Sequence, residues 1–121
     1  MEKPGDVLKK FYDAVALKDI QTTEKYLSDD LVFYGLFETY HNAKEYLTAL
    51  NGLLGITVRL DVKTIIAERD EAAVFFELET KAPAASTTLV AEWHKIKDGK
   101  IFSVRSAFDG RPFANMFGAG S

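Results

Sequence analysis

The sequence predicts an α+β domain in which helices pack on one face of a curved antiparallel sheet. Residues 6–18 and 42–55 carry apolar side chains at spacings of three and four, which is typical of amphipathic helices. Most of the second half alternates apolar with polar residues, which is typical of strands. Helices that precede a series of consecutive strands favour the α+β class.

The composition indicates one globular domain, which we expect to cover residues 1–121. Hydrophobic residues make up 47% of the chain and the net charge is −3, so we expect no nucleic acid and no membrane surface as partner. The chain has no cysteine, which excludes disulfides and thiolate metal sites. It shows neither a signal peptide nor an apolar run of the ~20 residues that span a membrane, so we expect a cytoplasmic protein.

The first half of the chain predicts two helices and then a strand. The stripe on the first helix, over residues 6–18, consists of Val7, Leu8, Phe11, Tyr12 and Val15. A shorter helical pattern begins at Asp19 and ends near residues 28–30. Residues 31–35 are apolar and aromatic but too few for a helix, so we expect a strand there.

A third helix follows a loop over residues 37–41. Asn42 is a residue type that caps helices, and the core side of this helix would be formed by Tyr46, Leu47, Leu50, Leu53 and Leu54. Gly55 predicts the end of the helix, because glycine can take the left-handed conformation found there.

The second half predicts long strands. Val58, Leu60 and Val62 alternate with charged residues, so they would form the dry face of one strand. Residues 68–71 turn the chain and residues 72–81 form the next strand. Pro83 then breaks the pattern, because proline cannot donate a hydrogen bond within a sheet.

Residues 92–109 predict a hairpin whose turn is Asp98-Gly99. On its first strand, alternation places Glu92 and His94 on one face and Trp93 on the other. The second strand would present Phe102, Val104, Ser106 and Phe108 on one side. Glu92 and His94 are therefore expected in an apolar environment.

Glu92 and His94 are the candidate catalytic residues. A buried glutamic acid could act as a general acid or donate a hydrogen bond to a carbonyl, while a histidine could accept a proton near neutral pH. The alternative is a structural polar pair, or an ion pair with Arg105 or Lys95. His41 and His94 are too far apart in sequence to form a metal motif, so we expect no metal and no cofactor.

Two segments of the chain resemble the nuclear transport factor 2-like superfamily. They are the hairpin, with the pattern E-W-x-K-I-x-D-G-K-I-x-x-x-R-x-x-F-D, and the segment S-D-D-L-V-F at residues 28–33. More narrowly, they resemble the SnoaL-like proteins. The resemblance implies a cone-shaped, cystatin-like fold in which the sheet wraps around the helices and leaves a pocket at its wide end. It also implies a homodimer packed through the outer sheet face. The superfamily includes isomerases, epoxide hydrolases, cyclases, dehydratases, ligand binders and interaction modules, so the fold alone does not identify a function.

Comparison with the ketosteroid isomerases of this superfamily places Phe11, Gly35 and Glu92 where those enzymes carry a tyrosine, an aspartate and a second acid. Because Gly35 supplies no carboxylate, we do not expect steroid isomerisation. The limonene epoxide hydrolases are not matched either.

In those hydrolases an aspartate on the last strand acts with an arginine and an aspartate on a middle strand. Ser106 stands at the first of these positions, and the middle strand carries Glu77 and Glu79 without an arginine. The closest similarity is to the acid and histidine of SnoaL-like cyclases, which Glu92 and His94 resemble.

These similarities imply a mainly apolar pocket lined by Phe11, Tyr12, Val15, Gly35, Ala49, Val74, Phe76, Val104, Ser106 and Phe108. Such a pocket suits a small apolar molecule with one or two oxygens. One hypothesis is an enzyme that transfers a proton next to a carbonyl, as in isomerisation, cyclisation or dehydration. The other is a binding or interaction module without catalysis.

Three apolar residues of the opposite sheet face, Phe75, Leu89 and Trp93, predict a homodimer interface. The alternative is that residues 113–117 cover them. Asp109 falls on the same face, and we expect it to pair with Arg111 or Arg105.

Overall fold

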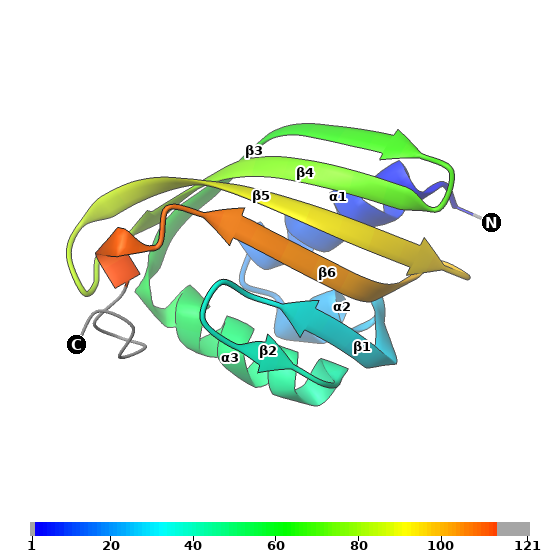
Figure 1. The fold of residues 1–121 in the computed structure, drawn as a ribbon, viewed down its shortest axis with the longest axis horizontal. Coiled ribbons are helices and arrows are strands. Elements are labelled where there is room, and N and C mark those ends of the chain that lie inside the picture. The colour runs from blue at the N-terminus through cyan, green and yellow to red at the C-terminus, as the bar shows by residue number, and fades with distance from the viewer. Residues whose placement is uncertain (1, 114–121) are drawn as a thin grey trace.

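The computed structural model describes residues 2–113, which form three α-helices and one six-stranded sheet. The helices are α1 (Pro4–Ala16), α2 (Ile20–Glu24) and α3 (Ala43–Ile56). The strands are β1 (Leu27–Tyr34), β2 (Thr39–Tyr40), β3 (Thr57–Glu68), β4 (Glu71–Thr80), β5 (Ser86–Lys97) and β6 (Lys100–Phe108). Figure 1 shows the long strands curving over the helices, so the predicted α+β class is confirmed.

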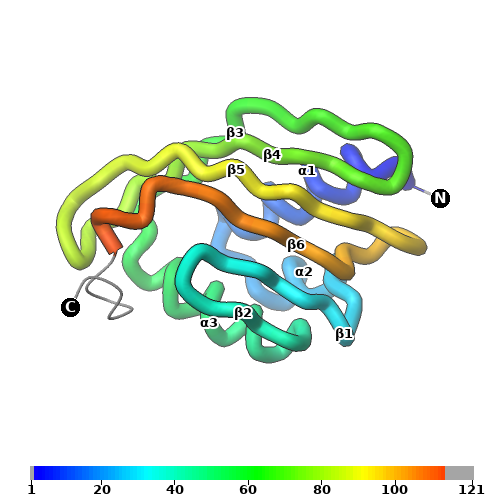
Figure 2. Tube along the Cα trace, viewed as in Figure 1, coloured from blue at the N-terminus to red at the C-terminus, as the bar shows by residue number. Residues whose placement is uncertain are grey.

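The sheet has the strand order β2-β1-β6-β5-β4-β3. Strand β1 lies parallel to β6, whereas every other neighbouring pair is antiparallel, so the sheet is mixed. Figure 2 shows β1 and β6 side by side although they are distant in sequence. This pairing brings the first strand against the predicted hairpin and closes one side of the core.

Helix α3 begins as predicted but ends later. The side chain of Asn42 accepts a hydrogen bond from the backbone N–H of Glu45 at 2.8 Å, which confirms the cap. The prediction that Gly55 ends the helix was wrong, because the helix continues through Ile56 and the chain then passes directly into β3. Thr57 at this junction is extended, so no left-handed residue is required.

The first strand also starts earlier than predicted. Helix α2 ends at Glu24 and β1 begins at Leu27, so residues 28–30 belong to the strand and not to a helix end. The pairing of β1 with β6 is irregular between Leu27 and Val32. Within the predicted loop, Thr39 and Tyr40 form β2 by pairing with the end of β1.

Two bulges shift side chains away from simple alternation. The β3–β4 register shifts between Thr57 and Arg59, and Val58 is left 56% exposed instead of lying on the dry face. In β6, the register shift next to Ile96 places Ile101 in the core, so Ile101 replaces Phe102 on the buried side. Both departures follow from one extra residue in a bulge.

The β5–β6 turn and the directions in which the β5 side chains point agree with the prediction. Asp98 and Gly99 have φ angles of 53° and 75°, the left-handed pair that a two-residue turn requires. Glu92 and His94 are buried, whereas Trp93 is 45% exposed and its indole N–H donates to Glu71. The sequence therefore predicts correctly which side chains of this strand point inward.

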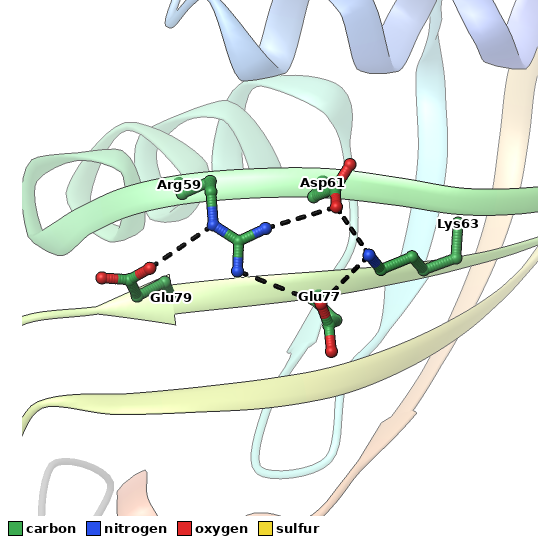
Figure 3. A network of polar contacts seen from close by, with 5 residues as sticks. All are labelled: Arg59, Asp61, Lys63, Glu77 and Glu79. Atoms are coloured by element: carbon green, nitrogen blue, oxygen red, sulfur yellow. Dashed lines mark hydrogen bonds and ion pairs between the residues drawn. The ribbon is translucent and has the colours of Figure 1, made fainter.

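The outer face of the sheet carries a network of five charged residues on β3 and β4 (Figure 3). Arg59 contacts Asp61, Glu77 and Glu79 at 3.3, 3.9 and 3.4 Å. Lys63 contacts Asp61 and Glu77 at 2.7 and 3.2 Å, and its hydrogen bond lowers the pKa of Asp61. All five side chains are exposed to solvent, which screens such pairs, so the network defines a polar surface and not a reaction centre.

Candidate functional site

A cavity of about 170 Å³ lies between the helices and the inner face of the sheet. Its wall is mainly apolar and aromatic and includes side chains from α1, α3 and the concave sheet face. The predicted pocket residues that line it are Tyr12, Val15, Gly35, Ala49, Phe76, Ser106 and Phe108. The wall also includes Glu92, one of the two candidate catalytic residues.

Three other predicted pocket residues do not line the cavity. Phe11, Val74 and Val104 are almost completely buried and belong to the packed core. Val74 and Val104 lie opposite Glu92 and His94 in neighbouring strands. Alternation predicted their inward direction correctly, but only part of the inner sheet face borders open space, and the rest packs against other side chains.

Several wall residues were not predicted. The segment between β1 and β2 contributes Leu36, Phe37 and Glu38, which the sequence places only in a loop. Tyr46 on α3 also lines the cavity, as its position on the core side of the helix could have indicated. Phe113 is buried and packs edge-on against Phe108, with 5.9 Å between ring centroids. The remaining tail, residues 114–121, lies outside the described residues.

A cluster of three polar side chains lies at the inner end of the wall. The hydroxyl of Tyr12 donates a hydrogen bond to Oε1 of Glu92 and lies 3.0 Å from Nε2 of His94. The same His94 nitrogen is 3.4 Å from Oε1 of Glu92. Tyr12 and Glu92 are 3% and 8% exposed, and His94 is fully buried. Residues from α1 and β5 thus meet within the core.

His94 lies behind the cavity wall and not on it. Tyr12 and Glu92 border the cavity, whereas His94 does not, so the prediction of an acid and a histidine together on the wall needs correction. Nδ1 of His94 is buried without a hydrogen-bond partner among residues 2–113. The neighbouring contacts of Nε2 favour the tautomer with its proton on that atom, because a proton on Nδ1 would be a buried, unpaired donor.

Burial and the neighbouring carboxylate keep two phenol groups protonated. Burial raises the pKa of Tyr12 well above its ordinary value, and the charge of Glu92 raises it further. The pKa of Tyr46 is raised well above the ordinary value for the same two reasons. Both hydroxyls are therefore hydrogen-bond donors at neutral pH.

Glu92 has one oxygen available to the cavity. Its Oε1 is the acceptor for Tyr12, whereas Oε2 makes no hydrogen bond with any described residue. Ser106 lies directly opposite Glu92 on β6 and also lines the cavity. The inner end of the cavity thus combines a carboxylate acceptor with a hydroxyl.

The ion pairs proposed as an alternative, which would join Glu92 and His94 to Arg105 or Lys95, are not formed in the structure. Lys95 lies over the ring of Trp93 at 5.1 Å, and Arg105 lies over the ring of Tyr34 at 4.1 Å. Asp109 pairs with Arg111, and their hydrogen bonds lower the pKa of Asp109 to about 2. Glu92 therefore accepts a hydrogen bond from Tyr12, with Nε2 of His94 3.4 Å from the same oxygen, and does not pair with an exposed cation.

The described residues offer no obvious metal site. No group of three histidine, aspartate or glutamate side chains in residues 2–113 is arranged to hold a metal ion. His41 is exposed before α3 and does not line the cavity. Over the same residues, each helix is too short or too polar to cross a membrane.

The curved mixed sheet that covers helices gives this α+β protein the fold of solved structures described as NTF2-like and cystatin-like. The family model of the SnoaL-like domain matches residues 8–104, and the chain belongs to this family. The predicted family is thereby confirmed. A comparison with curated proteins found no significant match.

Solved structures with similar folds come from several bacteria. A protein of unknown function with a cystatin-like fold from Xanthomonas campestris has a TM-score of 0.86 at 18% identity, over 96% of this chain and 98% of that one. An NTF2-like protein from Cytophaga hutchinsonii has a TM-score of 0.81 at 16% identity, over 93% and 95%.

A third similar structure is an LEH-like epoxide hydrolase from M. tuberculosis. Its TM-score is 0.76 at 21% identity, over 97% of this chain and 90% of that one. Identities this low establish a common fold and not a common activity.

Proposed function

We propose that the protein binds a small, largely apolar carbonyl compound in the cavity and that Glu92 transfers a proton at the carbon next to the carbonyl. The observation that supports this most strongly is the position of Glu92: a mostly buried carboxylate on an apolar wall, with Oε2 not bonded to any described residue. A base held in a dry site beside its substrate can contribute substantially to proton transfer.

The proposed reaction needs no cofactor, because Glu92 both removes the proton and returns it. Oε2 of Glu92 takes the proton from the carbon, and the electron pair of the broken C–H bond moves toward the carbonyl oxygen, giving an enolate. The hydroxyls of Tyr46 and Ser106, which line the same cavity, are two of the donors available for that oxygen. Glu92 then returns the proton to the same carbon or to a conjugated one, and the second outcome is an isomerisation.

Tyr12 and His94 would act as positioning residues. Tyr12 fixes Oε1 of Glu92 by a hydrogen bond, which leaves the other oxygen for the substrate. His94 contacts the Tyr12 hydroxyl at 3.0 Å from behind the wall, so it acts through Tyr12 and Glu92. In this proposal Glu92 carries out the proton transfer and His94 supports it.

The second candidate function is binding without turnover. It is favoured by Gly35, which lines the cavity at the position where the isomerases carry an aspartate. In this case Glu92 and the hydroxyls would only orient a ligand.

Hydrogen exchange of 1-tetralone in D₂O, followed by ¹H NMR, distinguishes the two functions. We expect the protein to accelerate loss of the C2 proton signal and Glu92→Gln to lower this acceleration by roughly 10²–10⁴-fold. Glu24→Gln makes the same chemical change on the exposed surface of α2 and is the matched control. Binding of the ketone without exchange would favour the second function, and equal exchange by Glu92→Gln would exclude Glu92 as the base.

We also propose that the protein forms a homodimer through the outer sheet face. Leu89 and Trp93 are 60% and 45% exposed there, and Phe75 lies on the same side of the sheet, half-buried. Sedimentation velocity of the double variant Leu89→Glu, Trp93→Glu should show a monomer where the wild type is a dimer. Leu17→Glu, at an exposed position after α1, is the control. A monomeric wild type, or a dimer that survives the double change, contradicts the proposal.

A further inference from the structure

We infer that the cavity takes an amine-bearing carbonyl compound, with its carbonyl end at Glu92 and its ammonium group at Glu38. This inference rests on the proposed function and adds the charge of the substrate. It also assigns a binding role to Glu38, a residue of the segment between β1 and β2 that the sequence did not single out.

The charged side chains of the cavity wall are all acidic. Two glutamates, Glu38 and Glu92, line the cavity, and the wall contains no lysine, arginine or histidine from the described residues. Within this wall a carboxylate or phosphate ligand would meet like charge without a compensating cation, because Lys44 borders only the adjoining hollow that Glu38 also lines. A cation would be attracted at either glutamate, and such attraction is strengthened where water is excluded.

The two glutamates differ in exposure. Glu92 is 8% exposed and belongs to the inner polar cluster, whereas Glu38 is exposed to solvent. A hydrated ammonium group is costly to bury, so it is better placed at the solvent side of the cavity. The apolar part of the ligand and its carbonyl can then occupy the buried part, where Glu92 and Ser106 lie on neighbouring strands.

Aromatic side chains support binding of a cation. The cavity wall contains five phenylalanines and three tyrosines, whose ring faces attract positive charge. Tyr40 lies close to Glu38: burial raises the pKa of Tyr40, and the charge of Glu38 raises it further. The ring centroid of Tyr40 is 5.9 Å from that of Phe33, and both rings line the cavity as Glu38 does. An ammonium group at this end would contact both a carboxylate and aromatic rings.

The inner polar cluster of Tyr12, Glu92 and His94 offers no positive charge that would offset the preference of the cavity for a cationic ligand. Nε2 of His94 lies 3.4 Å from Glu92, but a charged imidazole would bury a second N–H at Nδ1, which has no acceptor among the described residues. Glu92 contacts the Tyr12 hydroxyl and Nε2 of His94 in this cluster, and the cavity wall itself carries two glutamates and no basic side chain from the described residues.

Three tetralones that differ only in one substituent test the inference: 6-aminomethyl-1-tetralone, 6-hydroxymethyl-1-tetralone and 1-oxotetralin-6-carboxylate. Their dissociation constants are measured by isothermal titration calorimetry at low salt and in 0.5 M NaCl. We expect the amine to bind roughly tenfold more tightly than the carboxylate at low salt, with the alcohol between them and the difference reduced by salt.

Two variants then test whether Glu38 causes the difference in affinity between the amine and the carboxylate. Glu38→Gln should lower the ratio of amine to carboxylate affinity several-fold, whereas Glu24→Gln should leave the ratio unchanged. Equal binding of the three compounds, tighter binding of the carboxylate, or no binding of any compound would overturn the inference. Exchange of unsubstituted 1-tetralone is measured separately, so failure of charge selectivity is distinguishable from failure of the proposed proton transfer.

Discussion

The hydroxyl of Tyr12 donates a hydrogen bond to the carboxylate of Glu92 and so joins helix α1 to strand β5. The two residues are 80 positions apart in sequence. Their bond engages one carboxylate oxygen and leaves the other without a partner among the described residues. The proposed chemistry depends on that second oxygen, whereas the first oxygen takes part in a bond that we expect to stabilise the fold.

Replacement of Tyr12 by phenylalanine is expected to destabilise the protein. The change removes a donor from a mostly buried carboxylate, which typically costs about 1–3 kcal/mol of unfolding free energy. Urea denaturation followed by circular dichroism measures the loss. Tyr34→Phe is the control, because Tyr34 is on the exposed side of β1 and its ring remains available to Arg105. Equal stability of Tyr12→Phe and the wild type would mean that the bond contributes nothing.

The stability of the protein is expected to fall above about pH 10. Burial raises the pKa of Tyr12 and Tyr46, so the folded protein retains phenol protons that the unfolded chain loses near pH 10. The stabilisation is therefore complete below that pH and is lost as the pH rises beyond it. Absorbance at 295 nm should show that two of the five tyrosines ionise only on unfolding. Reversible ionisation of all five in the folded protein would contradict this.

Two glycine-to-alanine changes should have opposite effects. A Cβ at Gly35 would lie 2.8 Å from the carbonyl oxygen of Glu38, the oxygen that accepts the Gly35 N–H, so Gly35→Ala should cost about 1–3 kcal/mol. A Cβ at Gly55 meets nothing within 4 Å, and Gly55→Ala within α3 should stabilise by about 0.5 kcal/mol. Thermal unfolding of both variants measures the difference. Stabilisation by Gly35→Ala would show that the turn is not tightly packed.

The cap of α3 gives a further prediction. Asn42 accepts from the N–H of Glu45, and the Glu45 side chain accepts from the N–H of His41 at 3.0 Å. Asn42→Ala should lower the unfolding free energy by about 1 kcal/mol, whereas Asn42→Asp should retain the cap. Chemical denaturation of the two variants makes the comparison, and equal loss in both would show that the side-chain oxygen is not the stabilising group.

Local patterns in the sequence predict most of the fold. The stripe on α1, the cap at Asn42 and the Asp98-Gly99 turn depend on neighbouring residues, and the structure confirms all three. The end of α3 was misplaced because Gly55 suits a helix end as well as an exposed helix position. The exposure of Val58 depends on a bulge, which is set by pairing with β4 and not by the residues of β3 alone.

The candidate site could be predicted only in part. Alternation along β5 placed Glu92 inside and Trp93 outside. It could not show that Tyr12 reaches across from α1 to Glu92, or that His94 lies behind the wall, because both depend on how the helix packs on the sheet. The contribution of Glu38 was missed because a loop conformation decides which of its side chains border the cavity.

The most direct test of the site is NMR of protein labelled with ¹³C at the glutamate side-chain carboxyl carbons, titrated with 1-tetralone. The Glu92 signal is assigned by its absence in Glu92→Gln, and Glu24 serves as an exposed reference. We expect the Glu92 signal to move in a saturable manner while the Glu24 signal stays fixed. If the ketone binds and shifts other signals but leaves Glu92 unmoved, its carboxylate is not the polar end of the binding site.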